Sequence, residues 1–277
     1  MPTATVNGVR LFYDLTGAAG PPLVLVHGSW SDHHSWDRVV PALAERCRVL
    51  VYDRRGHSRS ERPSGQVSAD QHGADLAGLV EHLGLAPAHF AGSSFGGHIL
   101  LRLAMRRPDL FCSLAVHEPP LLGCLTGDPE LDSLRREVLA SQDAVVARLA
   151  AGDPEGGAHQ FVETVAFGSG AWEQLPPQAR QTFVGNAPTF LSDAGDPAGM
   201  TVDLAALAGF PRPVLLTRGE ASPPFFRPIM TKLAAALPRA ETRTYADAGH
   251  VPHLSHPADY AVTLAAFVAA ADARGSA

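Results

Sequence analysis

The sequence lacks the features that mark membrane, metal-binding and nucleic-acid-binding proteins. No apolar stretch in its 277 residues approaches the roughly 20 residues that a membrane-spanning helix needs. Its three cysteines, Cys47, Cys112 and Cys124, are an odd number without metal-ligand or C-x-x-C spacing, so we expect them to be reduced. The formal charge of −6 includes no long run of one sign, which disfavours nucleic acid as a partner.

The first residues also lack the basic segment followed by an apolar run that marks a secretory signal peptide. We therefore expect a cytoplasmic protein that does not bind membranes and that acts as a monomer or homodimer. Hydrophobic residues make up 45 % of the chain, which is enough for a sizeable core. The length is compatible with one large α/β domain, or with a core domain that carries an insertion.

Apolar runs typical of buried parallel strands alternate with helical patterns toward both ends of the chain. The predicted strands include Pro22–Val26, Arg48–Tyr52, Ala88–Ala91, Cys112–His117, Pro213–Arg218 and Glu241–Tyr245. Strands that alternate with helices predict a parallel sheet with right-handed crossovers.

The middle of the chain breaks this alternation. It contains helical patterns at Leu131–Ala150 and Gly157–Ala166 but no convincing strand, and proline and glycine interrupt it repeatedly. We therefore predict that residues 121–210 form a helical cap domain. This cap is inserted into a core domain made of residues 1–120 and 211–277.

A candidate nucleophile lies between a predicted strand and a predicted helix, in the run Gly92-Ser93-Ser94-Phe95-Gly96. Strand, G-x-S-x-G and helix together describe a nucleophile elbow, a strained turn that exposes the hydroxyl of Ser94 above the sheet edge. The alternatives are an ordinary turn or a phosphate-binding loop, and the latter would need a lysine near the start of the helix, where none is present.

The partners of Ser94 can be chosen from the ends of other predicted strands. His250 follows the last predicted strand and is the candidate general base, because imidazole exchanges protons near neutral pH. An oxyanion needs two N–H donors, for which we expect the backbone amides of Phe95 and Ser29, with Trp30 as the near alternative to Ser29.

Three further polar residues near these strand ends have structural explanations. His27 follows the first parallel strand, and we expect its imidazole to fix the adjoining loop without proton chemistry. We expect His57 to hold the neighbouring loop. Asp53 lies on that loop, where we expect it to pair with an arginine rather than to act as the catalytic acid.

These motifs resemble those of the α/β-hydrolase superfamily over essentially the whole chain. The matching segments are His27-Gly28, Asp53-Arg54-Arg55-Gly56-His57-Ser58, Gly92 to Gly97 and Ala248-Gly249-His250. The resemblance implies a mostly parallel eight-stranded sheet, a helical cap inserted after the sixth strand, and a Ser–acid–His triad.

The sequence departs from the common pattern at the triad acid. Most of the superfamily carries an aspartate after the seventh strand, where this chain has Ser222, which cannot stabilise an imidazolium electrostatically. Our best candidate is Glu118, directly after the predicted sixth strand, because that strand neighbours the strand of the elbow. Glu220 and Asp247 remain alternatives.

Three short blocks resemble lactonases of the zearalenone-degrading type, in which the acid also follows strand six. They are His117-Glu118-Pro119-Pro120, Ser222-Pro223-Pro224-Phe225-Phe226 and His250 to Pro257.

Aromatic residues suggest the substrate class. We expect Trp30, Trp172, Phe226 and His253 to contribute to substrate binding, although packing explains each of them singly. The prediction is a hydrolase without cofactor or metal, in which Ser94, Glu118 and His250 cleave an apolar or aromatic ester or lactone through an acyl-enzyme. The alternatives are a carbon–carbon (β-diketone-type) hydrolase, a perhydrolase, and a non-catalytic receptor on the same fold.

Overall fold

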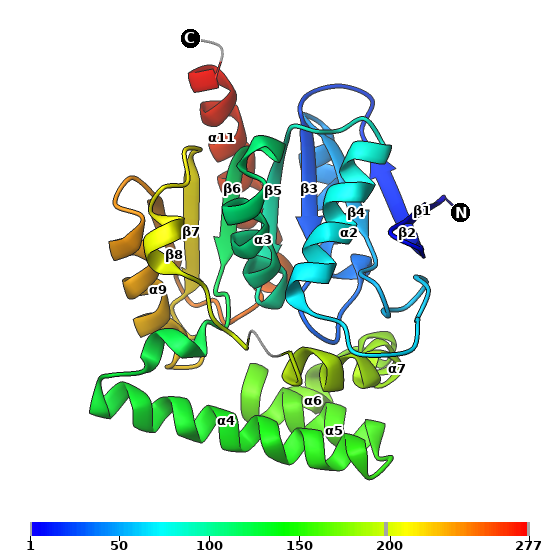
Figure 1. The fold of residues 1–277 in the computed structure, drawn as a ribbon, viewed down its shortest axis with the longest axis vertical. Helices are drawn as coiled ribbons and strands as arrows, with labels where there is room; N and C mark the ends of the chain where they lie inside the picture. Colours follow the sequence, from blue (N-terminus) through cyan, green and yellow to red (C-terminus); the bar gives the residue numbers. More distant parts are fainter. Residues whose placement is uncertain (1, 197–198, 276–277) are drawn as a thin grey trace.

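In the computed structural model, which describes residues 2–196 and 199–275, eight strands form one sheet in the order β1-β2-β4-β3-β5-β6-β7-β8 (Figure 1). The strands are β1 (Thr3–Val6), β2 (Val9–Thr16), β3 (Pro22–Val26), β4 (Arg48–Tyr52), β5 (Ala88–Ser93), β6 (Phe111–His117), β7 (Val214–Gly219) and β8 (Glu241–Tyr245). The first two pair antiparallel, and β2 also runs antiparallel to β4. All other neighbours are parallel, which confirms the predicted mostly parallel eight-stranded sheet.

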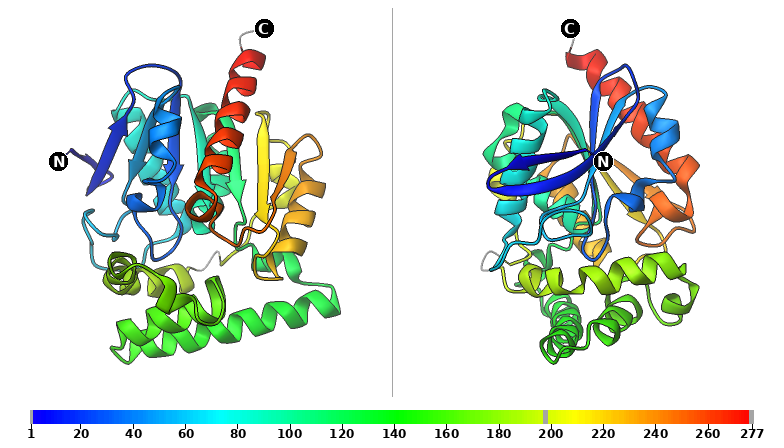
Figure 2. Two further views of the ribbon diagram at one scale, coloured as in Figure 1. Left: turned by 180° about the vertical axis from the view of Figure 1, so that it is seen from behind. Right: turned by 90° about the vertical axis from the view of Figure 1, so that its right-hand side faces the viewer.

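Helices cover both faces of the sheet, as its apolar strands require (Figures 1 and 2). One face packs against α2 (Ala69–His82), α3 (Phe95–Arg106) and α9 (Phe226–Ala236). The other face packs against α1 (Val40–Ala44) and α11 (Pro257–Gly275). Shorter turns connect these elements: η1 (His33–Trp36), η2 (Pro108–Leu110), η3 (Leu122–Leu125) and α10 (Pro252–Ser255).

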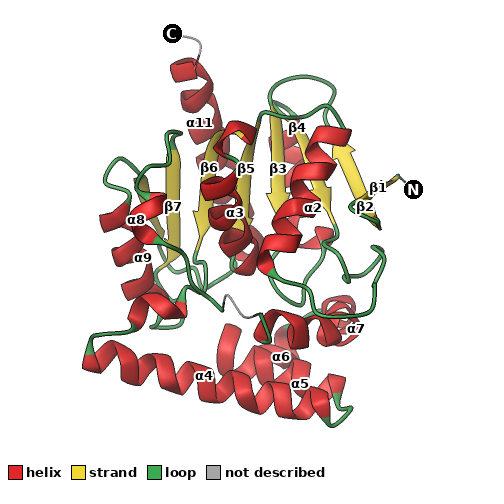
Figure 3. Ribbon diagram, viewed as in Figure 1, coloured by secondary structure: helices red, strands yellow, loops and turns green. Residues whose placement is uncertain are grey.

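A layer of helices lies beyond the carboxyl ends of the parallel strands (Figure 3). It consists of α4 (Pro129–Ala150), α5 (Pro154–Phe161), the π-helical turn η4 (Val162–Ala166), α6 (Ala171–Gln174) and α7 (Pro177–Ala194). Within the predicted cap segment 121–210, the described residues form helices, turns and loops but no strand. Residues 197 and 198 of that segment, and residues 1, 276 and 277 of the predicted core domain, lie outside the described residues.

Two features of this segment differ from the prediction. The 18-residue helix α7 was not predicted, because prolines at its start and Pro188 within it imitate a series of loop breaks. The short helix α8 (Leu204–Leu207) lies inside the predicted cap range but packs against α3 and α9. Its Leu207 is fully buried in the core cluster, so α8 packs with the sheet domain.

Candidate active site

Ser94 lies on a sharp turn between β5 and α3, where its backbone has a φ of 54° and a ψ of −124°. A positive φ in a residue other than glycine is strained, and such strain collects at functional sites. Two glycines make the turn sterically feasible. A Cβ on Gly92 would lie 2.7 Å from the carbonyl carbon of Gly96, and a Cβ on Gly96 would lie 2.2 Å from the carbonyl oxygen of Val26.

Glu118 and His250 form the central contact of the site, although 132 residues separate them in sequence. The Nδ1 atom of His250 lies 2.7 Å from Oε2 of Glu118, and the amide of Gly219 donates a 2.8 Å hydrogen bond to Oε1. Glu118 itself has a φ of 42° at the end of β6. Its neighbour His117 pairs in register with Ser93 and accepts a 2.8 Å hydrogen bond from the Ser94 amide through its carbonyl. Glu118, the next residue after His117, therefore lies beside the elbow, where the carboxyl ends of β5 and β6 meet.

Glu118 is fully buried, so its charge depends on local partners. Burial alone would raise the pKa of this carboxyl, but the imidazoles of His117 and His250 hold it well below its usual range. The Nε2 atom of His117 lies 3.4 Å from Oε2 of Glu118, while its Nδ1 contacts the hydroxyl of Thr217 at 2.9 Å. Glu118 is thus an ionised carboxylate at neutral pH, suited to orient an imidazole and to stabilise its positive charge.

The structure brings none of the other candidate acids to His250. Glu220 and Asp247 are exposed, and neither carboxylate accepts a hydrogen bond from a described residue. The hydroxyl of Ser222 is buried and likewise has no hydrogen-bond partner among those residues. The position usually occupied by the acid therefore offers no charge, and the geometry favours Glu118.

His250 is also held by an aromatic ring. Phe226 stacks on it with the ring centroids 4.3 Å apart and the planes inclined by only 13°. Within the described part of the chain, the hydroxyl of Ser94 makes no hydrogen bond to His250 in this conformation. Such contacts are often long in unliganded sites and shorten when the substrate binds.

The expected oxyanion donors lie beside Ser94. A Cβ on Gly28 would be 3.2 Å from the Cβ of Ser94 and 3.8 Å from its hydroxyl, so the loop after β3 passes against the elbow. The backbone amides of Ser29 and Phe95 donate no hydrogen bond to any described residue. Both are therefore available to a substrate oxygen.

The four predicted substrate-binding residues lie in different surroundings. Trp30 is fully buried and belongs to a cluster of cap side chains, stacked on Phe161 at 4.9 Å, and Trp172 is buried in the same cluster. Phe226 lies against His250, the candidate general base. His253 is buried between Trp36 and Tyr260, at centroid distances of 4.5 and 5.7 Å, which favours its packing role over substrate contact.

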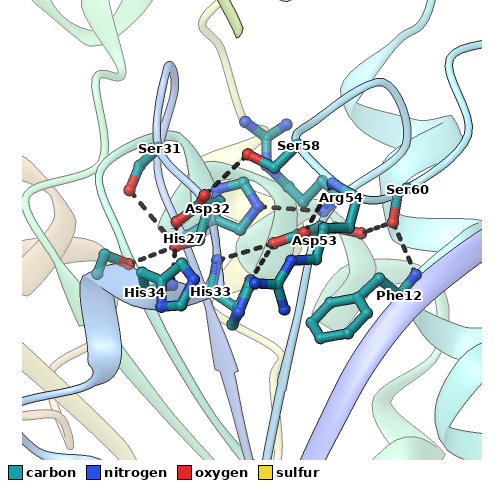
Figure 4. Close-up of polar contacts among 12 residues, drawn as sticks. Phe12, His27, Ser31, Asp32, His33, His34, Asp53, Arg54, Ser58 and Ser60 are labelled. Carbon is teal, nitrogen blue, oxygen red and sulfur yellow. Dashed lines mark hydrogen bonds and ion pairs between the residues drawn. The ribbon is translucent and has the colours of Figure 1, made fainter. Parts of the chain in front are cut away.

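A second group of buried polar residues fixes the loops that follow β3 and β4 (Figure 4). Asp53 accepts a hydrogen bond from Nδ1 of His33 at 2.6 Å, and others from the backbone amides of His33 and Arg59. Among the described residues, the contacts of the Asp53 carboxylate are thus with a histidine side chain and two backbone N–H groups, one of them that of Arg59. The neighbouring Asp32 accepts from the amide of His34 and the hydroxyl of Ser58.

Two groups of side chains within the described residues are close enough to share a metal ion: His117, Glu118 and His250, and Asp32, His33 and Asp53. All four oxygens of Asp32 and Asp53 already accept hydrogen bonds from protein donors. In the first group both oxygens of Glu118 are similarly engaged, by Gly219 and His250. Both groups are therefore explained as hydrogen-bonding networks.

None of the helices in residues 2–196 and 199–275 combines the length and hydrophobicity that a membrane span requires.

A family model described as "alpha/beta hydrolase fold" matches residues 21–257. The chain is 38 % identical over 114 residues to the dihydrolipoyllysine-residue acetyltransferase component of an acetoin cleaving system from Pseudomonas putida. This alignment covers 41 % of this chain and 31 % of that protein. It is 28 % identical over 292 residues to 2-hydroxymuconate semialdehyde hydrolase of Pseudomonas sp. (strain CF600), covering 96 % of this chain and 93 % of the relative. The chain spans less than half the length of three of the curated relatives that it matches.

Among solved structures, the enol-lactonase from Burkholderia xenovorans LB400 superimposes with a TM-score of 0.78 at 26 % identity, covering 97 % of this chain and 100 % of that one.

Proposed function

The chain belongs to the α/β-hydrolase family, and from that premise we propose that it is a serine hydrolase that cleaves an ester or lactone through an acyl-enzyme. The observation that carries the proposal is the buried 2.7 Å contact between Glu118 and His250, at the sheet edge where the elbow presents Ser94. A serine on the elbow argues against epoxide and haloalkane chemistry, which on this fold needs an aspartate nucleophile.

In the proposed reaction the hydroxyl of Ser94 attacks the substrate carbonyl while Nε2 of His250 accepts its proton. Glu118 accepts a hydrogen bond from the Nδ1–H group of His250, which keeps Nε2 unprotonated and able to act as a base, and its charge stabilises the imidazolium that forms. The amides of Ser29 and Phe95 bind the negative oxygen of the tetrahedral intermediate. Its collapse breaks the bond to the alcohol, which takes the proton from His250.

Water then completes the cycle by the same steps. It attacks the acyl group while His250 accepts its proton, the ester bond to Ser94 breaks, His250 returns the proton to the Ser94 oxygen, and the carboxylic acid leaves. For a lactone, alcohol and acid are parts of one molecule, so the product is a hydroxy acid.

The substrate class follows from the side chains near the reaction centre. Phe226 covers one face of His250, and the ring of Phe167 lies 6.5 Å from that of His250. Apolar walls with a few directed polar groups suit an apolar or aromatic acyl or alcohol group. The similarity to an enol-lactonase over 97 % of the chain supports a lactone among the candidates.

A second candidate is hydrolysis of a carbon–carbon bond in a β-diketone-type substrate by the same residues. The observation that favours it is the relative that aligns over 96 % of this chain, whose name makes it the hydrolase of a semialdehyde.

A fluorophosphonate probe tests the proposed function. We expect it to label the wild-type chain at Ser94, and a panel of lactones, aryl esters and β-diketones to reveal turnover. Ser94→Ala removes both labelling and turnover if the proposal holds. Stoichiometric ligand binding without turnover or labelling would instead support a receptor on the hydrolase fold.

A further inference from the structure

The carbonyl of Gly28 is held from one side by two buried donors. Nη2 of Arg54 donates to it at 3.0 Å, and Nδ1 of His27 at 2.9 Å. His27 carries its proton on Nδ1, because its Nε2 accepts a 3.1 Å hydrogen bond from the Arg54 amide. Burial lowers the pKa of His27 to about 3, so the ring stays neutral and this pattern is fixed.

Fixing this carbonyl also fixes the amide of Ser29. A trans peptide is planar, so its C=O and N–H groups point in opposite directions. The Ser29 amide therefore points away from Arg54 and His27, and Gly28 itself lies against Ser94. A donor locked in direction before the substrate arrives stabilises an oxyanion without reorganisation.

Arg54 contacts the side chain of Phe95 as well as the carbonyl of Gly28. Its guanidinium lies 5.2 Å from the ring centroid of Phe95, in addition to its bond to Gly28. The other neighbours at hydrogen-bond distance are Nε2 of His57 at 3.0 Å and Nε2 of His72 at 3.1 Å. Burial, reinforced by the charge of Arg54, holds the pKa of both imidazoles well below the usual range, so both rings stay neutral beside the guanidinium.

The carboxylate that faces Arg54 comes from the cap helix α7. Asp193 is only 4 % exposed, and its Oδ2 lies 4.0 Å from Nη2 of Arg54. The same oxygen accepts a 3.1 Å hydrogen bond from the hydroxyl of Ser29. About two turns earlier on α7, the side-chain amide nitrogen of Asn186 donates hydrogen bonds to the carbonyls of Trp30 and Ser31 at 3.3 and 3.1 Å. Helix α7 thus holds the loop at residues 29, 30 and 31.

We propose that Arg54 and Asp193 are positioning residues of the oxyanion hole, so that the hole is complete only when cap helix α7 is seated on the core. Arg54 orients the Gly28–Ser29 peptide from the core side. Asp193 holds Ser29 from the cap side, with its Oδ2 atom 4.0 Å from the buried guanidinium. This inference rests on the proposed serine-hydrolase function, because it assigns the Ser29 amide to a substrate oxygen.

Asp193 can be tested with matched variants. Asp193→Ala removes the acceptor for Ser29, whereas Asp193→Asn keeps an oxygen acceptor and removes the charge. The control is Asp196→Ala, which removes another contact between this segment and the core, a 2.7 Å bond from the Ala69 amide to Oδ2 of Asp196. It loosens the same junction without touching Ser29.

We expect kcat for an activated ester to fall about 10- to 100-fold in Asp193→Ala with KM within about threefold, since loss of a whole oxyanion donor costs about 10²- to 10³-fold. Asp193→Asn recovers most of that loss, and Asp196→Ala stays within about threefold of wild type. Adding Ser29→Ala to Asp193→Ala produces no further loss, because both remove the same hydrogen bond. Equal losses in Asp193→Ala and Asp196→Ala, or no loss in Asp193→Ala, would overturn the inference.

Hydrogen exchange separates this inference from the proposed function. The segment 27–36 includes the His33 and His34 amides, which are bonded to Asp53 and Asp32. We expect its exchange to accelerate in Asp193→Ala and to stay unchanged in Asp196→Ala, whether or not any substrate is turned over. A wild-type chain that fails to react with the fluorophosphonate would refute the function, while unchanged exchange in Asp193→Ala would refute the positioning.

Discussion

Replacing Glu118 by glutamine tests the assignment of the triad acid with almost no change of shape. Two hydrogen bonds decide which way the new amide turns. The Gly219 N–H, which now donates to Oε1 at 2.8 Å, can only face the amide oxygen, because two N–H groups would repel each other. The amide nitrogen must then face Nδ1 of His250, now 2.7 Å from Oε2.

A donor in that place forces His250 into the wrong tautomer. Nδ1 must accept, so the proton moves to Nε2, and the imidazole can no longer take the proton of Ser94. The same change in a serine protease lowers kcat by about 10⁴-fold, and we expect a loss of about 10³- to 10⁴-fold in Glu118→Gln. At 1.36 kcal/mol for each factor of ten, this corresponds to about 4–5.5 kcal/mol of transition-state stabilisation.

The assay is steady-state hydrolysis of an activated aryl ester at pH 7 to 8, with thermal unfolding measured on each variant. Glu220→Gln and Asp247→Asn are matched controls, since both carboxylates are exposed, and Ser222→Ala completes the set. We expect all three controls to stay within a few-fold of wild type. Near-normal turnover in Glu118→Gln, or a large loss in a control, would refute the reasoning.

Two further predictions concern stability. Burial raises the pKa of Asp193 from 3.8 to about 6, so the folded state keeps a proton that the unfolded state loses as the pH rises from about 4 to 6, and stability falls over that window. We therefore expect urea unfolding to show Asp193→Asn more stable than wild type by about 3 kcal/mol at pH 7.5, with little difference near pH 4. An unchanged or lower stability at pH 7.5 would contradict this prediction. Gly96→Ala places a methyl group 2.2 Å from the Val26 carbonyl and should lower the free energy of unfolding by about 1–3 kcal/mol, whereas Gly185→Ala, in α7 with nothing within 4 Å, should raise it by about 0.5–1 kcal/mol; similar shifts in both would show that the elbow is not tightly packed.

The central part of the sheet could be predicted because its parallel strands β3 to β7 are buried on both faces. Buried strands appear as short continuous apolar runs, and the predicted Pro22–Val26 and Arg48–Tyr52 match the observed β3 and β4 residue for residue. The helix α7 could not be predicted in the same way. Its stability depends on packing against the core and the rest of the cap, which outweighs the local cost of Pro188.

The site was partly predictable for a similar reason. The elbow is a local motif, and because Ser222 stands where an aspartate is usual, the sequence favours Glu118 as the acid. The hydrogen bond between Ser29 and Asp193 joins two ordinary polar side chains that are 164 residues apart, so no local sequence pattern predicts it. Asp53 shows the same limit, because its partner His33 comes from a turn twenty residues away.

The most direct test of the account is a crystal structure of the chain after reaction with a fluorophosphonate ester. We predict phosphorus bonded to Ser94 and the phosphoryl oxygen about 2.7–3.1 Å from the amides of Ser29 and Phe95. Glu118 should remain hydrogen-bonded to His250 in the same adduct. A carboxylate turned away from that imidazole, or an adduct on another residue, would contradict the account.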